Sequence, residues 1–222
     1  MKLNVTTGKT SKVRGRHADR TAAMRQRLID AAIVVLGRFG YSAMTTQSVI
    51  DEAGVSRGAI LHHFPTKIDL VVAVARYAAE AQNRYVRRRL AGIPPGIDLF
   101  MAITEATWDV ICQPPGLALL EIIIAARSDR GLDEQLPQVV ESFQNDQMAG
   151  VWAVASELGV RDQDAIERMV RLNRAAMRGL AMEMIFSGNR PAADEALELL
   201  VWYKRALVRA VLPAGEAPLF QR

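Results

Sequence analysis

Two short helical patterns separated by a tight turn constrain the fold of this chain more than any other feature. Thr45 stands where it can cap a helix over 46–53, and Gly54 follows as the residue that ends it. Ser56 can cap the next helix, because hydroxyl side chains accept hydrogen bonds from the free amides at helix starts. The sequence therefore predicts two helices of about two turns each, joined by Ala-Gly-Val-Ser at 53–56.

A longer amphipathic helix precedes this pair. Between Thr21 and Arg38 apolar residues recur at intervals of three and four, and Gly40 stands where such a helix would end. A further helix is predicted from Lys67 to about Gly92, with Thr66 as its cap. One long helix followed by two short helices around a tight turn matches a helix-turn-helix unit.

The rest of the chain predicts helices only. Helical patterns recur over about 97–112, 116–127, 134–158, 163–187 and 192–211, and Pro or Gly marks the breaks between them. We expect an all-α protein of about nine helices. Its parts are a basic, disordered arm over 1–20, an N-terminal three-helix helix-turn-helix domain over 21–66, and a C-terminal helical domain over 67–222.

Charge is unevenly distributed along the chain. Residues 1–92 carry 16 Lys and Arg against 6 Asp and Glu, whereas residues 93–222 carry 12 against 18. A basic front favours a polyanionic partner, although a solvated arm without a partner would have the same composition. The longest apolar runs, at 32–37 and 117–126, are shorter than a membrane span of roughly 20 residues. With a single cysteine and no apolar leader, we expect a cytoplasmic protein without membrane association.

The predicted helix at 57–64 has two different faces, because successive side chains on a helix point about 100° apart. The outer face holds Arg57, Gly58, Leu61 and His62, and the inner face holds Ala59, Ile60, His63 and Phe64. Neighbouring histidines therefore cannot easily chelate one ion, and we expect no metal site. An arginine can make two hydrogen bonds to guanine in the major groove, and a glycine beside it lets the backbone approach DNA. His63, at the edge of the inner face, is expected to be structural.

Donors for DNA phosphates stand at the starts of the predicted helices. Thr45 and Thr46 begin the second helix, Ser56 begins the third, and Lys67 begins the fourth. Hydroxyls, free amides and positive helix ends at these places can position a helix on the DNA backbone. The alternative is that these side chains are simply helix caps.

Residues 45–74 resemble the N-terminal DNA-binding motif of the TetR family of transcriptional repressors. The resemblance covers about 21–75 and rests on Thr46, the turn at 53–56, Gly58, the pair His63-Phe64, and Lys67. The family often has a phosphate-contacting tyrosine where this chain has Leu61, which we expect to contact a thymine methyl group or a sugar instead. The resemblance implies a homodimer that leaves its double-stranded DNA operator when a small-molecule effector binds to the C-terminal domain.

The same resemblance implies that the last two long helices form the dimer interface. Apolar stripes on these two predicted helices supply the candidate dimerisation residues: Met169, Leu172, Ala176 and Leu180 on the first, and Leu200, Tyr203 and Leu207 on the second. An ordinary core within one chain would show the same stripes.

The resemblance also implies a ligand cavity around the predicted helix at 97–112. The candidate ligand-binding residues are mostly apolar: Phe100, Met101, Thr104, Trp108, Cys112, Phe143, Trp152 and Met177. Possible polar anchors are Glu105, Asp109, Arg127 and Asn173. A stripe of methionine and aromatic residues is also typical of an ordinary core.

The sequence has no HExxH motif and no glycine-rich phosphate loop. We therefore expect no enzyme activity, no catalytic residue and no cofactor. Two alternatives remain at this point. One is a helical-bundle enzyme or ligand carrier whose basic N-terminus is incidental, and the other is a TetR-like activator or a regulator that does not respond to ligands.

Overall fold

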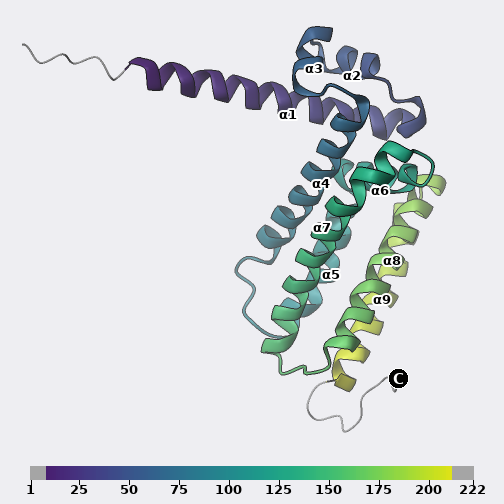
Figure 1. The fold of residues 1–222 in the computed structure, drawn as a ribbon. Coiled ribbons are helices and arrows are strands. Elements are labelled where there is room, and N and C mark those ends of the chain that lie inside the picture. The colour runs from purple at the N-terminus through teal and green to yellow at the C-terminus, as the bar shows by residue number, and fades with distance from the viewer. Residues whose placement is uncertain (1–8, 212–222) are drawn as a thin grey trace, which may run out of the picture. The chain divides into compact units, whose positions relative to one another are not determined.

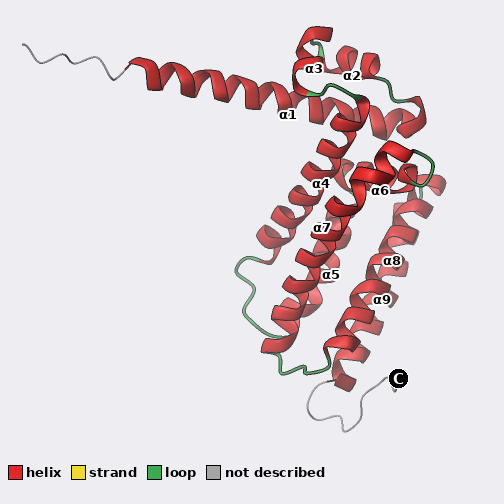
Figure 2. Cartoon of the chain, viewed as in Figure 1, coloured by secondary structure: helices red, strands yellow, loops and turns green. Residues whose placement is uncertain are grey.

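The computed structural model describes residues 9–211, and within that range every regular element is a helix (Figures 1 and 2). The prediction of an all-α fold with about nine helices is confirmed for this range. The helices are α1 (Lys9–Ala43), α2 (Thr46–Ala53), α3 (Arg57–His63), α4 (Lys67–Leu90), α5 (Ile97–Ile111), α6 (Pro114–Ala126), α7 (Arg130–Glu157), α8 (Gln163–Ser187) and α9 (Arg190–Val211). The chain divides into two compact units, Met1–Val74 and Ala75–Arg222.

The first unit is built on α1, which packs against α2. Apolar side chains from four helices are buried in it, among them Leu28 of α1, Val49 of α2, Ile60 of α3 and Leu70 at the start of α4. The helix α1 begins at Lys9, well before the predicted start at Thr21, and part of the predicted arm lies outside the described residues. Gly40 has a φ of 71°, so the helical path breaks there before a short continuation to Ala43.

Caps fix the ends of the short helices, as the sequence predicts. The Thr45 Oγ1 accepts a hydrogen bond from the Ser48 amide at 3.0 Å, and the Ser48 Oγ accepts one from the Thr45 amide at 3.0 Å. Gly54 has a φ of 60° and ends α2 in the left-handed conformation. The Ser56 Oγ accepts a hydrogen bond from the Ala59 amide at 3.3 Å. These local bonds hold the turn between α2 and α3.

The second unit is a bundle in which α5 packs against α6, α7, α8 and α9, while α8 and α9 also pack against each other. Figure 1 shows α7, α8 and α9 as long rods. The helix α6 starts at Pro114, two residues before the prediction, because proline suits the first turn of a helix. The helix α7 starts at Arg130, four residues before the prediction, because the Asp129 carboxylate caps it.

A sharp bend joins α5 to α6. The two helix axes meet at 78°. Gly116 makes the bend possible, since a Cβ atom there would overlap the carbonyl oxygens of Val110 and Ile111. In the described part of the chain no single helix has the length and apolar character of a membrane span, and this bent pair meets the criterion by length and composition only.

Candidate DNA-reading helix and ligand cavity

The helix α3 presents two faces of opposite character. Arg57, Gly58 and His62 are exposed, and the apolar Leu61 is 46% exposed. On the other side Ile60 is 1% exposed and Phe64, just after the helix, is 3% exposed. This is the division that the helical wheel predicts. A seven-residue helix is thus held by its apolar side while an arginine and a histidine face outward.

His63 lies at the boundary between the two faces and is half-buried. Burial, the neighbouring His62 and the cation of Arg25 lower the pKa of His63. The Arg25 guanidinium also stands 5.1 Å from the centre of the Phe64 ring, where a cation is attracted to the ring face. These contacts connect the end of α3 to α1 and support a structural role for His63.

The predicted phosphate donors stand at the helix starts, and three of them, Thr45, Ser56 and Lys67, have local bonding roles. Thr45 and Ser56 act as caps, and the Thr66 Oγ1 likewise accepts a hydrogen bond from the Asp69 amide at 3.1 Å. Lys67 is half-buried. Its Nζ donates to the Tyr41 carbonyl at 2.9 Å and lies 3.9 Å from the centre of the Tyr41 ring. Sequence reasoning missed this anchor, because no spacing rule connects residues 26 positions apart.

The helices α8 and α9 expose apolar side chains, but not most of those selected from the sequence. Of the seven candidate dimerisation residues, Leu172 is 47% exposed, whereas Met169, Leu200 and Leu207 are buried within the unit. The other three, Ala176, Leu180 and Tyr203, are half-buried. The large exposed apolar residues of the two helices are Leu172, Met182, Ile185, Phe186, Leu199 and Trp202. Each helix therefore has one apolar stripe in the core and another that faces outward.

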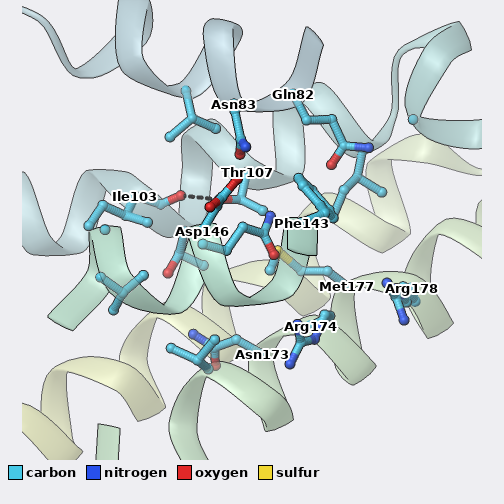
Figure 3. Close-up of a pocket in the computed structure, with 18 of the residues that line it drawn as sticks. Gln82, Asn83, Ile103, Thr107, Phe143, Asp146, Asn173, Arg174, Met177 and Arg178 are labelled. Carbon is cyan, nitrogen blue, oxygen red and sulfur yellow. Dashed lines mark hydrogen bonds between the residues drawn. The ribbon is translucent and has the colours of Figure 1, made fainter. Parts of the chain in front are cut away.

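A cavity of about 530 Å³ lies within the second unit, between residues of α4 to α9 (Figure 3). Its wall includes Thr104, Phe143 and Met177 among the eight candidate ligand-binding residues. The other five lie outside this wall. Phe100 and Met101 are in one core cluster together with Trp152, and Trp108 and Cys112 are in a second. Of the four possible anchors, Asn173 is in the wall.

Trp108 belongs to a polar network that ties α5 to the start of α9. Its indole nitrogen donates to the Asp194 carboxylate at 2.6 Å, and Arg190 donates to the same carboxylate at 2.8 and 3.0 Å. The indole hydrogen bond, aided by Arg190, lowers the pKa of Asp194. Nearby, burial raises the pKa of Cys112 to about 11, so its thiol is protonated at neutral pH. The two predicted ligand-binding residues, Trp108 and Cys112, therefore serve the structure of the unit.

Lys204 is a site residue that the sequence analysis missed. It lines the cavity, is 1% exposed, and donates hydrogen bonds to the Thr104 hydroxyl at 3.0 Å and to the Phe100 carbonyl. Burial lowers the pKa of Lys204 to about 7, against an opposing effect of Glu105. Its position four residues after Leu200 and three before Leu207 puts a lysine in a buried apolar stripe, which is the signal that could have identified it.

The chain matches known regulators both locally and over most of its length. The model described as "Bacterial regulatory proteins, tetR family" matches residues 28–74, which include α2 and α3. The HTH-type transcriptional regulator CymR of Pseudomonas putida is 31% identical over 176 residues, which cover 78% of this chain and 85% of CymR. The chain belongs to the TetR family. It is therefore a helix-turn-helix transcriptional regulator.

Solved structures of TetR-family and related proteins share this fold. One is the multidrug binding protein EbrR complexed with imidazole, with a TM-score of 0.54 and 26% identity over 79% of this chain and 92% of EbrR. Another is a putative TetR-family transcriptional regulator from Rhodococcus sp., with a TM-score of 0.67 and 17% identity over 84% of this chain and 99% of that one.

Proposed function

We propose that this TetR-family regulator is a homodimeric repressor that binds a near-palindromic, double-stranded DNA operator through α3. It leaves the operator when a small apolar or amphipathic effector fills the cavity of the second unit. The protein acts in the cytoplasm and catalyses no reaction. The observation that supports this proposal most is the exposed outer face of α3, where an arginine, a glycine and a histidine stand together on a helix with caps at its start.

Each residue on this face of α3 has a distinct role in reading DNA. Arg57 donates two hydrogen bonds to a guanine, Gly58 allows the backbone to approach, and His62 contacts a base or phosphate. Leu61 contacts a thymine methyl group or a sugar, which suits an apolar side chain that is 46% exposed. Phosphates are contacted by Thr45, Thr46, Ser56 and Lys67. Since an ammonium has three N–H donors, the anchor on Tyr41 orients Lys67 and is compatible with this role.

The dimer forms through the outward-facing stripes of α8 and α9. Leu172 and Phe186 are two heptads apart on one face of α8, and Leu199 and Trp202 lie three residues apart on α9. Phe186 is 92% exposed, Leu199 68% and Trp202 66%. Exposed apolar patches mark interfaces, and two copies of the same helix pair can cover each other about a two-fold axis. Leu172, Ala176, Leu180 and Tyr203 stay in this proposed interface, while the buried Met169, Leu200 and Leu207 support it from the core.

A selection from random DNA duplexes tests the proposal. Purified protein should retain duplexes that share a near-palindrome with half-sites roughly one helical turn apart. The complex on one such duplex should contain two chains, and the free protein should have twice the 24.4 kDa mass of one chain. A selected motif without two-fold symmetry, bound by a single chain, would refute the homodimer. Retention without any sequence preference would refute the role of α3.

A further inference from the structure

We propose that the effector of this protein is an amphipathic organic anion, with an apolar body and one anionic head group that binds at Arg174 and Arg178. This inference rests on the proposed function, since it assigns a chemical class to the ligand of the cavity in the second unit. The head group is a carboxylate or a chemically similar monoanion.

The cavity wall is apolar over most of its area. Apolar side chains from five helices contribute to it, including Val86 of α4, Ile103 of α5, Leu119 of α6, Phe143 of α7 and Met177 of α8. Such a wall favours a ligand whose body is an aliphatic chain or an aromatic ring. Figure 3 shows Phe143 and Met177 between the polar residues Gln82 and Asn83 on one side and Arg174 and Arg178 on the other. The apolar part therefore lies next to a cationic end.

Basic side chains outnumber acidic ones in the wall of this cavity. The basic ones are Arg87, Arg174, Arg178 and Lys204, and the acidic one is Asp146; Arg87 and Asp146 are exposed, and the other three are buried or half-buried. Arg174 and Arg178 stand one turn apart on α8 and are both half-buried. Desolvation and a neighbouring arginine lower the pKa of each, as expected of guanidinium groups that lack a close counter-charge. A guanidinium nevertheless stays charged near neutral pH.

Two neighbouring wall residues have buried polar atoms without a hydrogen-bond partner among the described residues. These atoms are the Arg174 Nη1 and the Asn173 Oδ1. Buried donors and acceptors are almost always paired, and an unpaired charged donor costs the most free energy. A carboxylate accepts a hydrogen bond from a guanidinium with matching geometry. An anionic head group would thus satisfy the Arg174 Nη1. The Asn173 Oδ1 is an acceptor, so it needs a hydroxyl or N–H donor elsewhere on the ligand.

A pair of fluorescent probes that differ in charge tests this inference. The anion 8-anilinonaphthalene-1-sulfonate and the uncharged N-phenyl-1-naphthylamine share the same apolar body. We expect Arg174→Met to weaken binding of the anionic probe about tenfold or more, the effect of losing a charge-assisted hydrogen bond, and to leave binding of the neutral probe nearly unchanged. Decanoate should displace the anionic probe at concentrations about tenfold or more lower than decanamide does. Decanesulfonate shows whether other monoanions serve as well as a carboxylate.

Two further variants serve as controls. Arg161→Met removes an exposed arginine in the loop between α7 and α8 and should not change binding of either probe. Arg174→Lys keeps a cation and should retain part of the preference for the anion. Thermal unfolding shows that each variant is folded, and Arg174→Met should be at least as stable as the original, because it removes an unpaired charge. Equal weakening of both probes by Arg174→Met, or no weakening of the anionic probe, would overturn the inference.

Operator binding separates failure of this inference from failure of the proposed function. If decanoate and decanamide bind in the cavity and weaken operator binding equally, an effector site exists but the anionic class is wrong. If both bind and operator affinity stays the same, the cavity does not regulate DNA binding and the proposed induction fails.

Discussion

Two adjacent histidines at the end of α3 have different roles because they point to different sides of the helix. His62 is exposed on the outer face of α3, whereas His63 is half-buried beside Phe64 and close to Arg25. We expect His62→Ala to change operator affinity while the free energy of unfolding stays within about 0.5 kcal/mol. His63→Ala should instead lower the free energy of unfolding by about 1 kcal/mol or more. Urea unfolding and gel shifts of both variants measure this, and a reversed pattern would contradict the assignment.

Lys204 makes a separate prediction about pH. Its pKa is about 7 in the folded protein and 10.5 in an ordinary environment. Below pH 7 the lysine is charged in both states, and the folded state bears the cost of burying the charge. Between pH 7 and 10.5 the unfolded chain holds the proton more tightly, so this cost falls as pH rises.

The comparison of the original protein with Lys204→Met isolates this effect. The free energy of unfolding of the original should rise relative to the variant between pH 7 and pH 10, by a few kcal/mol at most. Urea unfolding at several pH values and one protein concentration measures the difference. A difference that does not change with pH would mean that Lys204 titrates normally.

Helices as units show what the sequence could and could not predict. The helix α2 and the start of α3 follow from local signals, since Thr45, Gly54 and Ser56 each act within four residues. The outward face of α8 and α9 does not, because an apolar periodicity shows that a stripe is covered but not by which neighbour. For the same reason the apolar stripe at 97–112 could not distinguish core residues from cavity residues. Phe100 and Trp108 were predicted to bind the ligand, but both lie in core clusters. The hydrogen bonds from Lys67 to the Tyr41 carbonyl and from Lys204 to the Phe100 carbonyl join segments that are far apart in the sequence, so local patterns could not predict them.

The outward stripe of α9 predicts the effect of adding charge. Trp202→Glu should convert the dimer to a monomer at micromolar concentration, because a carboxylate would lose its hydration in an apolar interface. The matched control is Ile124→Glu on α6. Ile124 is also apolar and exposed, at 46%, and its replacement should leave the dimer intact. Sedimentation of both variants gives the result. A dimer that survives Trp202→Glu, or one that Ile124→Glu dissociates, would place the interface elsewhere.

Of the 16 Lys and Arg residues in 1–92, all but Arg57 lie outside α2 and α3. Lys2, Lys9, Lys12, Arg14 and Arg16 all precede residue 18. If these residues lie near DNA phosphates in the complex, deletion of residues 1–17 should weaken binding to all duplexes alike. It should also reduce the slope of log affinity against log salt concentration by up to about 4.5 for each chain, or about nine for the proposed dimer. Binding measured from low to moderate salt tests this, and an unchanged slope would mean that residues 1–17 do not contact DNA.

The most direct test of the function is the base preference of Arg57→Ala. Because Arg57 is exposed on the outer face of α3 and its removal disturbs no buried group, the variant should fold and dimerise normally. We expect operator affinity to fall by about 1 to 3 kcal/mol per half-site and the preference to relax at one base position of each half-site. Binding of the original and the variant to operators changed one base pair at a time measures both effects. If Arg57→Ala leaves the affinity and the preference at every position unchanged, α3 does not read the operator.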